Sequence, residues 1–177
     1  MARFAAFLRG INVGGHSARK AQLIRAFEEC GFDNVSTFRA SGNVLFEASR
    51  SPKPDAAKIE AALESELGYE APVFLRSATQ LAGVAATDPF SAKQVKASKG
   101  KLQIAFLPAK PAKAKAVEAL GLALESDPLA IEATELYWLP SAGTQETELD
   151  LRTLEKLLGP WTMRTKGTVE QIAAKLS

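Results

Sequence analysis

Residues 8–15 read LRGINVGG, and this stretch joins a short apolar run to a helical pattern. Three of the chain's twelve glycines lie in it, among arginine, asparagine and histidine side chains. Glycine permits left-handed backbone angles and leaves the neighbouring N–H groups accessible. The composition predicts a binding loop, whose candidate ligand-binding residues are Arg9, Gly10, Asn12, Gly14, Gly15 and His16.

The segments on either side of this loop predict a strand and a helix. Residues 2–8 are apolar on both faces, which is typical of a central strand. The run is too short for the apolar core of a signal peptide, so we expect no targeting segment here. After the loop, Ser17 is the predicted N-cap of a helix that ends at Gly31. Leu23 and Phe27 form its apolar stripe.

The remainder of the first half predicts two strands joined by a tight turn, a second helix and a fourth strand. Residues 41–43 read SGN between two apolar stretches, which is a hairpin-turn signal. The predicted strands are 35–40, 44–47 and 72–76, and the predicted helices are 55–67 and 78–86. The first six elements follow the order strand, helix, strand, strand, helix, strand, as in a split-βαβ, ferredoxin-like unit.

The same order of elements recurs in the second half. The predicted strands are 102–107, 129–133, 136–139 and 161–164, and the predicted helices are 112–120, 149–158 and 169–176. We therefore predict an α+β fold of two tandem ferredoxin-like (split βαβ) units with antiparallel sheets plus a C-terminal helix. The predicted domains are residues 1–90, with a connecting helix, and residues 91–177, with the terminal helix.

This topology brings two polar turns to one end of the first sheet. The first and second strands of a split-βαβ unit run parallel, so the segments that leave them emerge at the same end. Residues 9–17 and 41–43 are therefore predicted to be neighbours. Their proximity adds Arg39, Ser41 and Asn43 to the candidate site.

The composition excludes several classes of site and location. Cys30 is the only cysteine and His16 the only histidine, so an intrachain disulfide and a structural zinc site are excluded. No window approaches the roughly 18 apolar residues of a membrane helix. We expect a cytoplasmic protein with no metal, no cofactor and no membrane partner.

The two N-terminal motifs resemble those of a known family. LRGINVGG at residues 8–15, followed by a helix and by SGNVLF at residues 41–46, is similar to the bacterial domain of unknown function family sixteen ninety-seven. The resemblance spans nearly the whole chain, through DPF at residues 88–90 to the tail. It implies a two-unit α+β fold of the duplicated ferredoxin-like kind. It implies no established reaction, cofactor or catalytic residue.

The tail of the chain departs from the family pattern. Family tails resemble TRNWNTV, whereas residues 163–169 read MRTKGTV. Arg164, Thr168 and Val169 match, and Arg164 joins the candidate ligand-binding residues. If the tail completes a site in the family, the changes at residues 165–167 are expected to weaken or alter it.

The glycine loop matches neither common nucleotide motif. No Gly-Lys-Ser/Thr follows Gly15, and the spacing is not that of a dinucleotide-binding fold. Gly14 and Gly15 are instead predicted to form an anion nest at the start of the following helix. Arg9 would add a bidentate contact to phosphate or carboxylate. The alternative is that the glycines only permit a tight crossover from strand to helix.

No residue is assigned as catalytic. His16 is the one side chain whose ordinary pKa lies near neutrality, but a lone histidine at a helix entrance is more often a surface residue or a cap than a base. Acylphosphatases place a phosphate-binding loop between strand one and helix one of the same fold, with an arginine and an asparagine as working groups. This fold-level analogy supports acyl-phosphate hydrolysis as one alternative function.

A lysine-rich segment supports another alternative. Residues 91–115 carry seven lysines and no acidic residue, and these are Lys93, Lys96, Lys99, Lys101, Lys110, Lys113 and Lys115. Such a block suits a nucleic-acid or protein-interaction module, although a solvated linker explains it more simply. The leading hypothesis remains a protein that binds a small anionic or phosphate-bearing ligand at residues 9–15.

Overall fold

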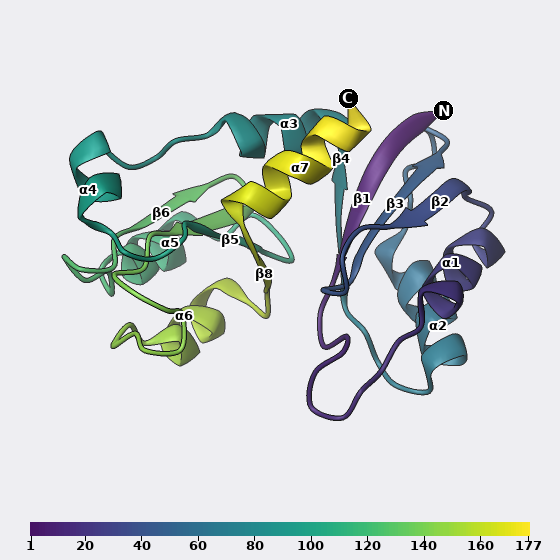
Figure 1. The fold of residues 1–177 in the computed structure, drawn as a ribbon, viewed down its shortest axis with the longest axis horizontal. Helices are drawn as coiled ribbons and strands as arrows, with labels where there is room; N and C mark the ends of the chain where they lie inside the picture. Colours follow the sequence, from purple (N-terminus) through teal and green to yellow (C-terminus); the bar gives the residue numbers. More distant parts are fainter. The chain divides into compact units, whose positions relative to one another are not determined.

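The computed structural model describes residues 1–177, and these residues form two compact units (Figure 1). The first unit consists of residues 1–83 and 171–177, and the second unit consists of residues 84–170. The terminal helix thus begins in the second unit and ends in the first, whereas the sequence assigns it to the second half alone. The division into domains at residues 1–90 and 91–177 stays a prediction.

Each unit contains a four-stranded antiparallel sheet. The strands of the first sheet are β1 (Ala2–Leu8), β2 (Asp33–Thr37), β3 (Asn43–Ala48) and β4 (Val73–Ser77). Those of the second sheet are β5 (Gln103–Phe106), β6 (Leu129–Glu132), β7 (Glu135–Trp138) and β8 (Thr162–Thr165). The strand orders are β2-β3-β1-β4 and β6-β7-β5-β8. Both sheets therefore have the same ferredoxin-like order, which confirms the predicted fold class.

Seven helices accompany these strands. They are α1 (Lys20–Glu29), α2 (Ala56–Leu67), α3 (Ala78–Ala86), α4 (Ala92–Ala97), α5 (Lys113–Leu120), α6 (Leu151–Leu158) and α7 (Lys166–Leu176). The short helix α4 lies in the lysine-rich segment 91–115, where the sequence predicts no helix before residue 112, and Ser91 and Gln94 form a capping box at its start. None of the helices has the length and apolar character that crossing a membrane requires.

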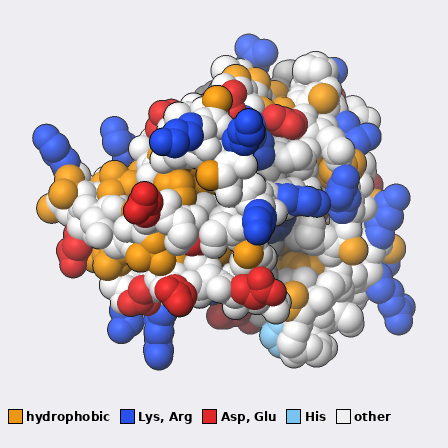
Figure 2. All heavy atoms as spheres, turned by 60° about the vertical axis from the view of Figure 1, so that its left-hand side comes forward, with side chains coloured by type: hydrophobic (Ala, Val, Ile, Leu, Met, Phe, Trp, Pro, Cys, Tyr) orange, Lys and Arg blue, Asp and Glu red, His pale blue; other side chains and the backbone are white.

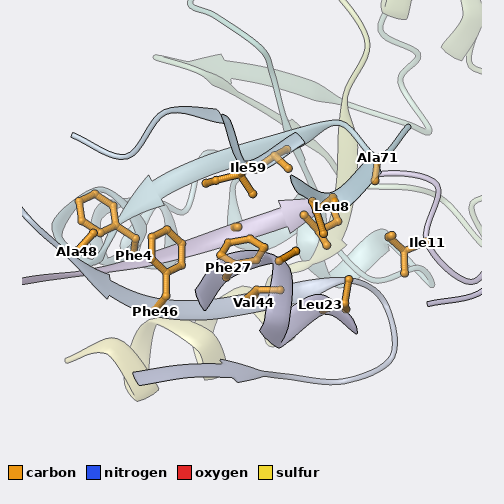
Figure 3. Close-up of a cluster of buried hydrophobic side chains, with 14 residues drawn as sticks. Phe4, Leu8, Ile11, Leu23, Phe27, Val44, Phe46, Ala48, Ile59 and Ala71 are labelled. Carbon is orange, nitrogen blue, oxygen red and sulfur yellow. The ribbon is translucent and has the colours of Figure 1, made fainter. Parts of the chain in front are cut away.

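The core of the first unit lies between its sheet and the helices α1 and α2 (Figure 3). Phe4, Ala6 and Leu8 alternate along β1 and point to this face, because successive side chains of a strand point to opposite faces. Phe27 from α1 and Phe46 from β3 meet there with ring centroids 5.2 Å apart. The apolar pattern of β1 thus places its last residue, Leu8, in the core immediately before the loop begins.

The core of the second unit contains a buried carboxylate. Asp127 is 2% exposed and accepts hydrogen bonds from Trp138 Nε1 at 3.1 Å, Thr147 Oγ1 at 2.9 Å and Ser126 Oγ at 2.8 Å. Burial by itself raises the pKa of Asp127, but hydrogen bonds from these three side chains and from Ser141 outweigh it and lower the pKa below 3.8. The carboxylate holds the loops at this end of the second sheet.

The last strand of each unit carries a buried arginine at the same position. Arg76 on β4 pairs with Ala5 on β1, and Arg164 on β8 pairs with Ile104 on β5. In both, Nη1 donates to the carbonyl of the preceding residue at 2.8 Å. The internal repeat, which the sequence shows only as an order of elements, therefore extends to individual side chains.

The residues that follow these arginines cap the next helix in the same way. Ser77 Oγ accepts from the Gln80 N–H at 3.2 Å, and Thr165 Oγ1 accepts from the Thr168 N–H at 3.3 Å. A side-chain oxygen that binds the N–H three residues later satisfies one free donor of a helix start. This cap explains why α7 begins at Lys166, three residues before the predicted start at Val169.

Candidate functional site

The loop after β1 is exposed and held in one conformation by side-chain hydrogen bonds. Asn12 Nδ2 donates to the carbonyl of Ala40 at 2.9 Å, and Asn12 Oδ1 accepts from the Ala18 N–H at 3.0 Å. Asn12 has φ of 57°, a left-handed conformation that asparagine tolerates better than most residues. The Asn12 side chain thus links the two ends of the loop and joins the loop to the segment after β2. The predicted proximity of the two turns is confirmed.

Two glycines form a tight turn at the tip of this loop. Gly14 and Gly15 have φ of 58° and 83°, and His16 N donates to the carbonyl of Val13 at 3.0 Å. Positive φ at both central residues is the mark of a type I′ turn, which strongly favours glycine. No atom lies within 4 Å of the position that a Cβ would take on either glycine. The turn therefore faces open space.

Side-chain hydrogen bonds also hold the turn that precedes β3. Asn43 is fully buried, and its Nδ2 donates to the carbonyl of Phe38 at 2.8 Å and to Ser41 Oγ at 2.9 Å. Gly42 has φ of 79°, and a Cβ added there would lie 3.1 Å from Cβ of Leu8. Buried Asn43 and exposed Ser41 therefore stabilise the turn, and Gly42 lets it approach β1.

His16 stacks on a tyrosine from the end of α2. The rings of His16 and Tyr69 are 4.1 Å apart with an interplanar angle of 19°, and Tyr69 Oη donates to the carbonyl of Ser17 at 2.9 Å. Burial raises the pKa of the Tyr69 hydroxyl. His16 is exposed and is the pale-blue side chain in Figure 2. Sequence reasoning missed Tyr69, because a single aromatic residue between two elements has no periodic signal.

The helix after the loop begins later than predicted. Its first residue is Lys20 and its N-cap is Arg19, whose N–H donates to Gln22 Oε1 at 3.0 Å. Ser17 is therefore not the cap, because the carbonyls of Val13 and Ser17 and the side chain of Asn12 already organise the preceding residues. The prediction that Gly14 and Gly15 lie at the helix N-terminus is wrong, since four residues separate Gly15 from α1.

The two arginines of the predicted site differ in their surroundings. Arg9 is half-buried, and its backbone N–H donates to the carbonyl of Pro72 at 3.0 Å. Arg39 is exposed with φ of 59°, and its Nη2 donates to Gln171 Oε1 at 2.6 Å. Its guanidinium also lies 5.4 Å from the ring centroid of Phe38. Both belong to the first unit.

Arg164 lies on β8 in the second unit. It is 8% exposed, and its Nη1 also donates to Thr162 Oγ1 at 2.8 Å. Burial lowers the pKa of its guanidinium to about 10, so the side chain stays charged at neutral pH. Because Arg76 occupies the same position of the first unit, the internal repeat explains a buried arginine here without a ligand.

The lysines of residues 91–115 are all exposed. Lys93 and Lys96 lie on α4, and Lys113 and Lys115 lie on α5. Figure 2 shows Lys and Arg side chains projecting from the surface with Asp and Glu side chains among them.

No group of three or more His, Cys, Asp or Glu side chains is arranged to hold a metal ion.

The sequence matches one protein family along most of its length. The family is described as a protein of unknown function (DUF1697), and its model matches residues 1–137. The chain belongs to this family. No curated protein matches the sequence. The matched residues include the glycine loop, the turn before β3 and Tyr69.

A solved structure shares the fold of both units. The conserved bacterial protein SP0830 from Streptococcus pneumoniae is similar with a TM-score of 0.75 and 20% sequence identity. The similarity covers 99% of this chain and 98% of that chain. At this identity the likeness establishes the fold alone.

Replacing Asn12 with glycine should loosen the loop without straining its backbone. Glycine accepts the positive φ at this position, so the variant removes only the two side-chain hydrogen bonds. Each bond contributes about 0.5–1.5 kcal/mol. We expect the Ala18 N–H to exchange with solvent roughly tenfold faster, measured by hydrogen–deuterium exchange. Asn34→Gly is the matched control, because Asn34 also has positive φ and bonds only to Glu47. Unchanged exchange at Ala18 would show that the loop is held by other contacts.

Proposed function

We propose that the loop at residues 9–17 of the first unit binds a small anionic or phosphate-bearing ligand. The observation that carries the proposal is that the loop is exposed and is nevertheless held in one conformation by side-chain hydrogen bonds. A segment that is already ordered loses little conformational entropy on binding. Asn12, Asn43 and Tyr69 supply that order through bonds to backbone carbonyls.

The donors of the proposed site are backbone N–H groups and two guanidinium groups. The open space around Gly14 and Gly15 leaves their backbone accessible to a ligand. Arg9 and Arg39 lie on the two segments that Asn12 joins, and a guanidinium group pairs with phosphate or carboxylate through two parallel hydrogen bonds. In this proposal Asn43 and Ser41 hold the turn rather than contact the ligand. Gly10 remains a predicted contributor, whereas Arg164 lies in the second unit and is not part of this proposal.

A thermal-shift screen against nucleotides, sugar phosphates, acyl phosphates and short oligonucleotides tests the proposal, because a ligand that binds the folded state raises the melting temperature. Arg9→Ala should weaken the affinity of any small-molecule hit by about tenfold or more, since charge-assisted hydrogen bonds contribute about 1.5–3 kcal/mol. Arg25→Ala is the matched control, because Arg25 is an exposed arginine of α1 that pairs with Glu66. Equal affinity in the wild type and Arg9→Ala would reject the loop as the site.

The same screen separates the two alternative functions. Turnover of an acyl phosphate, lost in Arg9→Ala, would make the loop the site of a hydrolase. A shift caused only by oligonucleotides and abolished by salt would favour the lysine segment 91–115, because phosphate contacts release counterions. The seven lysines of that segment are exposed, which keeps an interaction module as the second candidate. A cytoplasmic location is part of the proposal and is supported by the single cysteine.

A further inference from the structure

A cavity of about 660 Å³ opens in the first unit, at the end of the sheet where β1 begins. Its walls come from four segments: the start of β1, the connection between β3 and α2, the junction of β4 with α3, and the end of α7. The lining residues include Arg3, Arg50, Lys53, Ser77, Thr79 and Leu176. The cavity is large enough to hold a small organic molecule.

The charged side chains that line this cavity are all basic. Arg3, Arg50 and Lys53 lie on segments far apart in the sequence, and no Asp or Glu is among the lining residues. Like charges brought together by folding repel one another, and the cost falls when an anion binds between them. The fold therefore concentrates positive charge at a concave surface.

Only one of these cations has partners within the protein. Arg3 Nε lies 3.5 Å from Glu47 Oε1, and Arg3 Nη1 donates to the backbone oxygens of Leu176 at 3.3 Å and Ser177 at 2.7 Å. Arg50 and Lys53 are exposed and take part in no side-chain hydrogen bond or ion pair. The structure thus leaves two cations at the cavity without a counter-charge.

Polar groups of the β4–α3 junction complete the wall. The Ser77 N–H donates to Gln80 Oε1 at 2.9 Å, and the Gln80 N–H donates to Ser77 Oγ at 3.2 Å, so each side chain binds the backbone of the other residue at the start of α3. Thr79 is exposed beside them, and its hydroxyl is available to a ligand in the cavity. A hydroxyl next to three cations suits a tetrahedral oxyanion, which accepts several hydrogen bonds at once.

We propose that this cavity is a binding site for a phosphate group carried by a small molecule. Arg50 and Lys53 supply the charge, the Thr79 hydroxyl donates a hydrogen bond, and Arg3, which is paired with Glu47, lines the same cavity. The site is independent of the glycine loop. The seven residues of β1 separate the two, and a strand of that length spans about 20 Å.

Calorimetric titration of the full chain with pyrophosphate tests this site. The double variant Arg50→Ala, Lys53→Ala should weaken the affinity by about tenfold or more, because it removes both unpaired cations. Both side chains are exposed, so the variant should fold, and circular dichroism and the melting temperature check this. Lys58→Ala is the control for loss of a positive charge elsewhere in the same unit, on α2. A second control, Arg9→Ala, reports on the glycine loop.

The outcomes separate the two proposed sites. Weaker pyrophosphate binding in the double variant, with Lys58→Ala unchanged, supports the cavity. Binding that is lost in Arg9→Ala and kept in the double variant assigns the anion to the glycine loop and overturns the cavity site. Equal weakening in the double variant and Lys58→Ala would reveal general charge attraction, and this also overturns it. So would the absence of any pyrophosphate binding to the wild type.

Discussion

Replacing Phe27 with alanine should lower the free energy of unfolding of the first unit by about 3–5 kcal/mol. Phe27 is fully buried on α1, and its ring lies 5.2 Å from that of Phe46 and 6.2 Å from that of Phe32. Truncation removes the apolar contacts and leaves a cavity that the rigid neighbours fill only in part. Urea denaturation followed by circular dichroism measures the loss, read from the transition of the first unit.

A surface valine provides the comparison for Phe27. Val117 on α5 is 63% exposed, so Val117→Ala should change the free energy of unfolding by less than about 0.5 kcal/mol. A loss of less than about 1 kcal/mol for Phe27→Ala would contradict the packing described for the first core. Because α1 begins shortly after the loop at residues 9–17, the same variant should also raise hydrogen exchange in that loop.

The second large effect is expected at Asp127. Asp127→Ala removes the acceptor of the hydrogen bonds from Ser126 and Thr147 and leaves the indole N–H of buried Trp138 without its partner. The unpaired buried indole costs about 1–3 kcal/mol, and the loss of the bonds from the two hydroxyls, which can turn toward solvent, adds about 1 kcal/mol, so we expect a total loss of about 2–4 kcal/mol in the second unit. Glu125→Ala, at an exposed acidic residue nearby, should be close to neutral. Urea denaturation of both variants tests this, and equal stability of the two would contradict the buried network.

Asp127 also predicts a dependence of stability on pH. Its pKa in the folded protein lies below the ordinary value of 3.8, because hydrogen bonds favour the charged form. The unfolded chain therefore binds the proton more tightly, and the contribution of Asp127 to stability is full above about pH 5. It is lost as the pH falls through the folded-state pKa. The difference in unfolding free energy between the wild type and Asp127→Asn should shrink accordingly in acid.

The order of elements could be predicted from sequence because each element has local signals that agree. For α2, Asp55 accepts from the Ala57 N–H and Gly68 has φ of 80°, as the N-cap and the glycine at the helix end predict. The apolar run of β1 likewise gives its strand bounds. The start of α1 could not be found in this way, because Ser17 offers its carbonyl to Tyr69 rather than its hydroxyl to the helix.

From the sequence, the residues of the candidate site could be predicted, but their individual roles could not. The order of elements predicts that residues 9–17 meet the turn before β3, and the bond between Asn12 and Ala40 shows that contact. The division between residues that face solvent and residues that brace the loop depends on three-dimensional packing, so the burial of Asn43 had no sequence signal. The basic cavity had none either, since residue 3 and residues 50–53 share no motif.

The helix α7 has a consequence for the order in which the protein is made. Ribosomes synthesise a chain from its N-terminus, and domains generally fold as they emerge. Residues 171–177 belong to the first unit, where Arg3 binds the carbonyl of Leu176. The first unit is therefore complete only after the entire second unit has been translated. The earliest residues to leave the ribosome are among the last to reach their final contacts.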